Sequence, residues 1–167
     1  DQFGFTYALN DAQTHRHKHE KDHLEDEKIK FQVIKSHFIG SSWSGRVAEG
    51  KQSSFYRNYY LGQDSSKWRS GIRSVAQISL VDFYPGVNLL LDGSNGQLKY
   101  SLEVAPGVDV NQLRYRIEGS DSIWISEGQL HIHTRFGEIT ESQPIAWTIK
   151  DGRKVNVPVQ FELKENV

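Results

Sequence analysis

Four histidines lie within one polar segment, residues 10–28, and form the densest group of potential metal ligands in the chain: His15, His17, His19 and His23. In an extended chain the first three imidazoles share a face, and in a helix the last two would be four residues apart. Either arrangement could bind Zn²⁺ or Ni²⁺ weakly. The segment is rich in acidic residues and poor in apolar ones, so it cannot offset the entropy cost of becoming ordered. We therefore expect a mobile, solvated loop, with metal binding as the alternative.

A second histidine pair lies further along the chain. His131 and His133 flank Ile132 in an alternating segment, so their side chains point to the same side of a strand. Two imidazoles on one face can chelate a metal. An exposed polar face of a sheet has the same pattern, and we favour that interpretation.

Catalytic signatures are absent from the sequence. There is no GxSxG, HExxH or phosphate-loop motif, and there is no cysteine. Carboxylate pairs for glycoside hydrolysis are set by spacing in three dimensions, so a sequence cannot exclude them. The available carboxylates are those of Asp82, Asp92, Glu103, Glu138 and Glu141. Each is equally explained as a turn or surface residue, and we expect a non-catalytic protein without a cofactor.

The candidate ligand-binding residues are aromatic, with one arginine beside them: Tyr59, Tyr60, Trp68 and Arg69. Flat rings with polar ends stack on sugars, so the aromatic residues of the chain raise the hypothesis of carbohydrate recognition: Tyr56, Tyr59, Tyr60, Trp68 and Trp124, with Trp43 and Trp147. Trp68 lies between two cations in a polar segment, and we expect a lid packed beneath a cation rather than an exposed ring.

Aromatic rings also line the cores of β-sheet proteins. Trp147 is in phase with Ile145 and Ile149 at every second position, which predicts that its side chain is buried in the core.

The central elements that must position these residues are two strands, 87–91 and 97–104, joined by a polar turn. In the second strand apolar residues alternate with polar ones, the pattern of a half-buried strand. The DGSNG sequence at 92–96 suits a chain reversal. Pro85-Gly86 and Pro106-Gly107 fit type II turns at the two ends of this hairpin.

Other short segments with strand patterns are separated by turn signals and lie at 3–9, 29–39, 72–83, 112–117, 122–126, 129–134, 144–149 and 154–163. The change of phase from Ile29, Phe31 and Val33 to Ile34 and Phe38 predicts a bulge near Val33. Asp64 and Gly71 fit the start and end of a short helix at 65–69. The whole pattern predicts an all-β fold, an antiparallel β-sandwich with little or no helix.

The length, composition and net charge of the chain limit the classes of partner that it can bind. The chain has 167 residues of which 37% are hydrophobic, so one domain, 1–167, is expected. The net charge of -1 provides no broad field for nucleic acid or anionic membrane, and no apolar run is long enough to span a bilayer. The first residue is Asp1 rather than Met, and we interpret the chain as a fragment of a larger modular protein. An unpaired sheet edge would be a place for association.

Three segments of the sequence are distinctive when taken together: NYYLGQDSSKWRSGI at 58–72, VDFYPGVNLLLDGSNGQLKYSLEVAPGVDVNQLRYRIEGSDS at 81–122, and GQLHIHTRFGEITESQPIAW at 128–147. This combination resembles a domain of unknown function that occurs near the N-terminus of large surface or secreted proteins of gliding Gram-negative bacteria and their relatives. The resemblance covers most of 55–163. In the block that begins with Tyr84-Pro85-Gly86, Asn88 stands where Asp is usual in that family, and Leu102 in the second strand stands where Phe is usual.

This resemblance implies an exported or cell-surface location and a long modular parent chain. Proteins of that kind often continue into SBBP-type β-propeller repeats, immunoglobulin-like or PKD modules, and a C-terminal sorting domain for type IX secretion or gliding-associated export. It brings no catalytic residues. We therefore expect a structural, adhesion or docking module whose partners are neighbouring modules, a cell-surface protein or a glycan. The alternative is a carbohydrate-binding module or a glycan-active enzyme of sandwich type.

Overall fold

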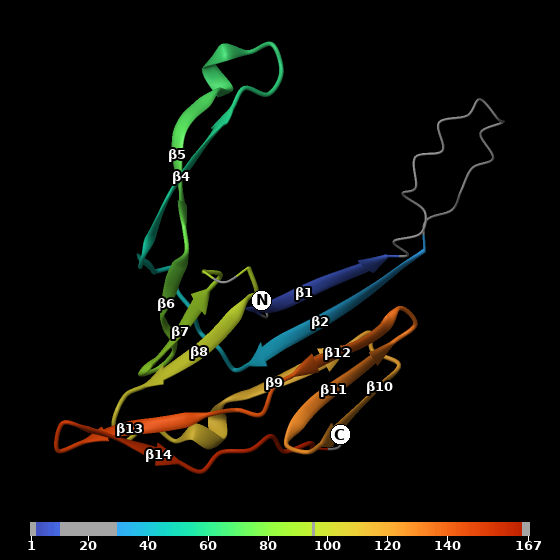
Figure 1. Cartoon of the computed structure of the whole chain (residues 1–167), viewed down its shortest axis with the longest axis vertical. Coiled ribbons are helices and arrows are strands. Elements are labelled where there is room, and N and C mark those ends of the chain that lie inside the picture. The colour runs from blue at the N-terminus through green and yellow to red at the C-terminus, as the bar shows by residue number, and fades with distance from the viewer. Residues whose placement is uncertain (1–2, 11–29, 95, 165–167) are drawn as a thin grey trace. The chain divides into compact units, whose positions relative to one another are not determined.

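The computed structural model describes residues 3–10, 30–94 and 96–164. Within these ranges the regular structure consists of β-strands and two single-turn 3-10 helices, η2 (Ser65–Lys67) and η3 (Val110–Gln112) (Figure 1). The all-β fold class with little or no helix is therefore confirmed. The strands are β1 (Phe3–Asn10), β2 (Phe31–Ile39), β3 (Val47–Glu49), β4 (Gln52–Tyr59), β5 (Arg69–Val75), β6 (Gln77–Tyr84), β7 (Val87–Asp92), β8 (Lys99–Val104), β9 (Arg114–Glu118), β10 (Ser122–Ser126), β11 (Gln129–Thr134), β12 (Gly137–Glu141), β13 (Ala146–Lys150) and β14 (Arg153–Val157).

The strands form several small sheets. Their orders are β1-β2-β9, β3-β6-β7-β8, β10-β11-β12, β4-β5 and β13-β14. The pairings within the last four of these sheets are all antiparallel, as the sequence predicted.

The chain divides into two compact units, each built from two segments. Unit 1 contains Asp1–Phe3 and Phe38–Tyr115, and unit 2 contains Gly4–His37 and Arg116–Val167. The boundaries fall inside strands, where no linker composition marks them. The expectation of one domain over 1–167 stays a prediction.

The core of unit 1 is aromatic and lies around β6 and β7. Phe83 meets Phe38 edge to face at 5.1 Å between ring centroids and meets Tyr84 in the same way at 5.4 Å. Val87 and Leu89 on β7 are buried beside them in the sheet. The Tyr84 hydroxyl donates to the carbonyl oxygen of Ile39 over 3.1 Å, so this polar group is satisfied inside the core.

The central hairpin forms as predicted. Strands β7 and β8 are antiparallel with Leu89 opposite Leu102, and β6 reaches β7 through the Pro85-Gly86 turn. Gly86 has φ of +73°, the left-handed conformation that glycine adopts without strain. At the other end of β7, Asp92 accepts hydrogen bonds from the Ser94 backbone N–H over 2.8 Å and from Gln77 Nε2 over 2.7 Å. Bonds from Ser94 and then Gln77 lower the pKa of Asp92 to about 2.

Strand β2 keeps one buried face along its length. Its buried residues are Gln32, Ile34, Ser36 and Phe38. The predicted bulge near Val33, with a change of face there, is wrong, because Val33 lies on the exposed face. The apolar pattern was misleading since half of the buried positions carry polar side chains.

The buried Gln32 side chain joins three segments of unit 2. Its Nε2 donates to the Gly119 carbonyl oxygen over 2.9 Å and to Asp121 Oδ1 over 3.4 Å, and its Oε1 accepts from the Arg135 backbone N–H over 2.8 Å. The neighbouring Ser36 hydroxyl is buried and has no hydrogen-bond partner within the described residues. The amide of Gln32 is thus a satisfied polar group, while the hydroxyl of Ser36 is not.

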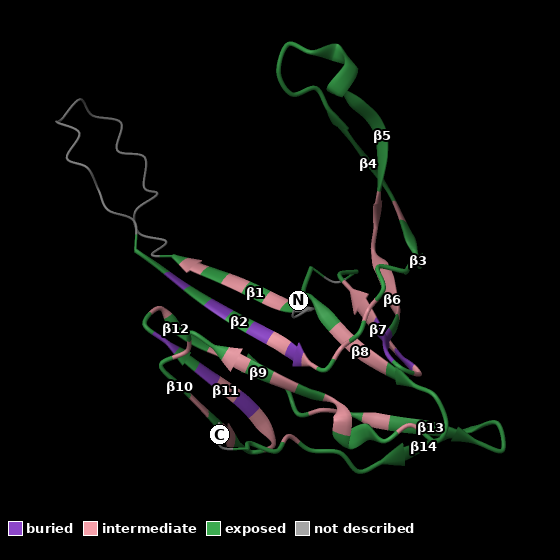
Figure 2. Cartoon of the chain, turned by 180° about the vertical axis from the view of Figure 1, so that it is seen from behind, coloured by how far each residue is buried: buried purple, intermediate pink, exposed green. Residues whose placement is uncertain are grey.

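Unit 2 has a second buried strand, β11. Leu130, Ile132 and Thr134 are buried, and the alternate residues are less so, which is the two-residue period predicted for this segment. Figure 2 shows this burial on β2, β7 and β11. The buried apolar side chains of unit 2 thus come mainly from strands β2 and β11.

The end of the chain differs from the prediction. The alternating pattern at 154–163 predicted one long strand, but β14 ends at Val157, before Pro158. Proline has no N–H to contribute to a ladder, so the strand stops there. Trp147 was expected in the core, and this prediction is wrong: the residue is 51% exposed, and Lys154 Nζ lies 3.8 Å from the centroid of its ring.

Candidate binding surface

The β4–β5 hairpin is a two-stranded ribbon that is exposed on both faces. Within the described residues its strands pair only with each other, and every residue from 54 to 73 is exposed (Figure 2). An isolated two-stranded hairpin is marginally stable in water, because it has no third strand or packed face to support it. This ribbon therefore needs local devices to hold its shape.

One such device is a bulge at the end of the strand pair that is next to the turn. The strand register shifts between Arg57 and Tyr59, and Gly71 on the facing strand has φ of +67°. The Gly71 backbone N–H donates to Asn58 Oδ1 over 2.8 Å. A side-chain acceptor thus replaces a ladder bond at the bulge.

The far end of the ribbon is a single 3-10 turn. Asp64 Oδ1 accepts from the Ser66 backbone N–H over 3.0 Å and from the Ser66 hydroxyl over 2.7 Å, and these bonds lower the pKa of Asp64. Asp64 therefore caps the turn as predicted. The predicted helix at 65–69 is too long, because the turn ends at Lys67 and Gly71 lies inside β5.

The four predicted binding residues come together at this end of the ribbon. Tyr60 and Trp68 meet edge to face at 5.5 Å between centroids, and Tyr59 is directly opposite Arg69 in the strand pair. Trp68 Nε1 donates to the carbonyl oxygen of Gly62 over 3.2 Å. The predicted lid beneath a cation is wrong: the Trp68 ring packs against Tyr60 and remains 41% exposed.

The neighbouring Arg69 is bonded to backbone carbonyl groups. Its Nη1 donates to the carbonyl oxygens of Ser66 and Trp68, each over 2.8 Å. The guanidinium is therefore used to fix the turn, and Tyr60 and Trp68 keep exposed ring surface.

The ribbon also carries large apolar side chains that the sequence did not indicate as binding residues. Phe55 is 77% exposed and Leu61 is 75% exposed, and Ile72 is exposed as well, beside the exposed Tyr56 of the predicted aromatic set. The sequence indicates this surface by large residues at consecutive positions. Consecutive residues of a strand point to opposite faces, and both faces of this ribbon are exposed. Grouped exposed rings of this kind are typical of interaction sites.

The ribbon is strongly basic although the whole chain is almost neutral. Residues 51–75 contain one acidic residue, Asp64, and five basic ones, which gives this segment a net charge of +4. The basic residues are Lys51, Arg57, Lys67, Arg69 and Arg73. Lys67 is 3.7 Å from Asp64, whereas Arg57 and Arg73 have no acidic partner in the described part of the chain.

A second polar group lies on the β10–β11–β12 sheet. The rings of Trp124 and His131 are stacked at 5.2 Å with 5° between their planes, and His131 Nδ1 is 2.6 Å from Glu138 Oε1. Thr140 Oγ1 also donates to Glu138 Oε1 over 3.1 Å. The hydrogen bond from His131 is the main cause of the lowered pKa of Glu138.

The two histidines of β11 therefore face different carboxylates. His133 Nδ1 is 4.0 Å from Asp121 Oδ2, while His131 pairs with Glu138. Among the residues that the structure describes, no group of three or more histidine, aspartate or glutamate side chains is arranged to hold a metal ion. His15, His17, His19 and His23, with the rest of the predicted loop after Asn10, lie outside the described residues.

The carboxylates considered for catalysis have individual structural contacts. Asp82 forms an ion pair with Arg46 at 2.6 Å, Asp92 caps the turn after β7, and Glu138 bonds to His131. Glu103 lies opposite Asn88 in the β7–β8 pair, and Glu141 lies opposite Leu130 in the β11–β12 pair.

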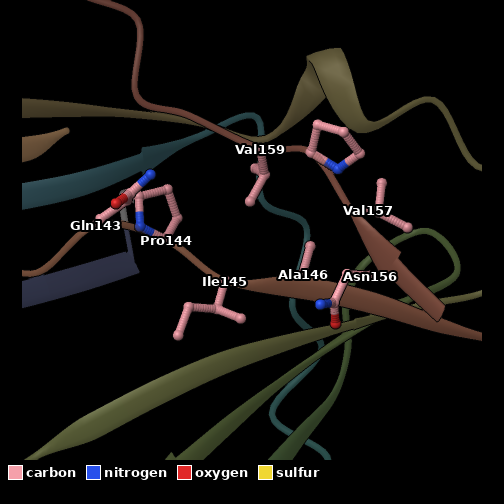
Figure 3. A pocket seen from close by; sticks show the side chains of 8 residues that line it. Gln143, Pro144, Ile145, Ala146, Asn156, Val157 and Val159 are labelled. Carbon is pink, nitrogen blue, oxygen red and sulfur yellow. The ribbon is translucent and has the colours of Figure 1, made fainter. Parts of the chain in front are cut away.

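A shallow hollow of about 290 Å³ lies beside the β13–β14 ribbon (Figure 3). Its lining is mostly aliphatic, with two amide side chains, and consists of Gln143, Pro144, Ile145, Ala146, Asn156, Val157, Pro158 and Val159. None of these eight side chains is an acid, a base or a nucleophile. The hollow offers apolar surface and two amides for contact.

The fold and the exposed ribbon define an antiparallel all-β domain with an aromatic, basic hairpin. The family model described as "Domain of unknown function (DUF7948)" matches residues 1–167, and the chain belongs to this family. The resemblance to a domain of unknown function is thereby confirmed. Comparison with curated proteins gave no match, and comparison with solved structures gave none. No helix in the described ranges is long and apolar enough to cross a membrane.

Proposed function

We propose that this domain is a non-catalytic docking or adhesion module of a bacterial cell-surface or secreted protein, and that the β4–β5 hairpin makes the contact. The single observation that carries the proposal is the exposure of every residue from 54 to 73, with aromatic and apolar side chains on both faces of the ribbon. Large exposed apolar groups that cluster in this way mark interaction surfaces.

The composition of the ribbon supports protein docking. Tyrosine, tryptophan and arginine are the residues that most often dominate the binding energy of protein interfaces. The Tyr60–Trp68 pair and the bulge at Gly71 hold the ribbon in one shape before a partner arrives, which reduces the entropy cost of binding.

The cellular context of the proposal comes from the resemblance to domains of exported proteins, including proteins linked to gliding motility and type IX secretion. In such a chain the partners would be neighbouring modules, another surface protein or a glycan. The hairpin would then present a fixed contact surface, and the sheets would support it.

The test compares binding with stability. Tyr59→Ala and Trp68→Ala should each weaken binding of the domain to a neighbouring segment of its parent protein, measured by calorimetry, and should leave the melting temperature almost unchanged. Trp147→Ala, which removes an exposed tryptophan from β13, serves as the matched control. Reduced stability with unchanged binding would leave these residues with a structural role only and would contradict the proposal.

A carbohydrate-binding module is the second candidate, and the exposed faces of the Tyr60–Trp68 pair favour it, because such rings stack on sugars. A glycan array probed with the intact chain distinguishes the two. Binding to a defined glycan that Trp68→Ala abolishes would support sugar recognition, and a blank array would count against it.

A further inference from the structure

Resting on the proposed docking function, we infer that the partner of the β4–β5 hairpin is an acidic polypeptide segment, and that Arg57 and Arg73 contact its carboxylates. The inference specifies the chemistry of the partner, which the docking function alone leaves open.

The first argument is charge. Residues 51–75, which are the ribbon and the preceding Lys51, have a net charge of +4 within a chain whose net charge is -1, so positive charge is concentrated on this one element. The guanidinium groups of Arg57 and Arg73 have no acidic partner among the described residues, although Arg46 elsewhere in the same unit is paired with Asp82. An acidic partner would complement this surface and would accelerate association.

The second argument is the arrangement of rings and cations along the ribbon. Tyr56 is directly opposite Arg73, and Tyr59 is directly opposite Arg69. Residues opposite each other in a strand pair share one face, so each ring lies beside a cation. A partner that lies along the ribbon would meet apolar surface and positive charge side by side, which suits a segment that carries both apolar and acidic side chains.

The third argument favours a polypeptide over another polyanion. Both outer edges of the hairpin are unpaired within the described residues, so backbone N–H and C=O groups are available along the ribbon. An extended polypeptide can pair with such an edge as an added strand, with a main-chain repeat that matches it. A polysaccharide or a nucleic acid has no main chain with this repeat, so it would bind only through contacts with the positive charges of the ribbon.

The experiment selects partners without assuming their sequence. A phage-displayed library of random linear peptides is selected on the intact chain and on the double variant Arg57→Gln/Arg73→Gln. A second double variant, Lys150→Gln/Arg153→Gln, removes the same charge from β13 and β14 and serves as the control. We expect enrichment of peptides rich in Asp and Glu on the parent and the control, and loss of this enrichment on the hairpin variant.

Affinity measurements on the selected peptides complete the test. The hairpin variant should bind them about tenfold more weakly or worse, since two charge-assisted contacts are lost. Selection of neutral or basic peptides, or equal binding by the hairpin variant, would overturn the inference. Alginate or oligo-dT competing as well as the peptides themselves would show binding of polyanions in general, and would overturn it too.

The same measurements separate this inference from the docking function. If Tyr59→Ala and Trp68→Ala abolish binding to the parent protein while Arg57→Gln/Arg73→Gln changes nothing, the hairpin is a docking element but its partner is not acidic. If none of these substitutions affects binding, the docking function itself fails.

Discussion

Asn58 and Gly71 are joined across the β4–β5 hairpin by a hydrogen bond of 2.8 Å from the Gly71 N–H to Asn58 Oδ1. The bond closes the bulge at a point where neither strand has support from a third strand. At this bulge the shape of the proposed binding surface therefore depends on the Asn58 side chain and on the backbone conformation of Gly71.

Substitution of Gly71 should loosen the ribbon. A Cβ at this position would contact no atom within 4 Å, so Gly71→Ala acts only through the strain of placing alanine at φ of +67°. We expect the hairpin to open more easily by about 1 kcal/mol, which is roughly a fivefold faster amide exchange within β4 and β5. Hydrogen exchange by NMR measures this.

Gly93→Ala is the control, since Gly93 is outside the left-handed region and its added Cβ would be 4.0 Å from the nearest atom. Asn58→Ala should accelerate exchange of the Gly71 amide in the same way. Unchanged exchange in both hairpin variants would show that the bulge does not hold the ribbon.

Two phenylalanines should respond differently to truncation. Phe55 is 77% exposed and Phe83 is 1% exposed. We expect Phe55→Ala to change the free energy of unfolding by less than about 0.5 kcal/mol, and Phe83→Ala to lower it by about 4 kcal/mol. Urea unfolding followed by circular dichroism gives both values. A large loss for Phe55→Ala would mean that the ribbon is packed against other residues.

Two polar residues on the buried face of β2 should also differ. Gln32→Leu leaves the Gly119 carbonyl and the Arg135 N–H without partners, and we expect a loss of about 3 kcal/mol in the free energy of unfolding. Ser36→Ala removes a buried hydroxyl that has no hydrogen-bond partner among the described residues, so stability should rise by about 1 kcal/mol. Equal effects of the two substitutions on urea unfolding would contradict the assigned hydrogen bonds.

Asp92 should make stability depend on acidic pH. Its pKa is about 2 in the folded state, below the value of about 3.9 for an unfolded aspartate, so its contribution is fully present above the unfolded value. The contribution is lost as the pH falls through the folded value. The stability difference between the parent and Asp92→Asn should therefore decrease from about pH 5 toward about pH 2.

Urea unfolding over this pH range tests the expectation. Glu103→Gln is the control, because it removes an exposed carboxylate from the adjacent strand of the same sheet. A difference between parent and Asp92→Asn that stays constant with pH would show that the Ser94 and Gln77 bonds do not stabilise the charged form.

The sequence predicted the strands wherever one face is buried and the other is not. The β7–β8 hairpin and strand β11 follow the two-residue period, and the Pro85-Gly86 turn follows from the conformations that those residues prefer. These features are local, so a local pattern reveals them.

The wrong predictions concern residues whose burial depends on distant parts of the chain. On β2 the buried positions include Gln32, whose partners are far along the sequence, so hydropathy gave the wrong face. Trp147 has the pattern of a core residue but lies on an exposed ribbon. The candidate residues of the β4–β5 hairpin were found by type, while their exposure and the pairing of Tyr60 with Trp68 required the structure.

The contacts of Gln32 also have a consequence for synthesis. Its partners are 87 and 103 residues away in sequence, at Gly119 and Arg135. A ribosome or an export channel that delivers the amino end first exposes Gln32 to water until the last third of the chain has emerged. Completion of unit 2 is therefore a late event, and closure of this long loop should be the slow step in maturation of the domain.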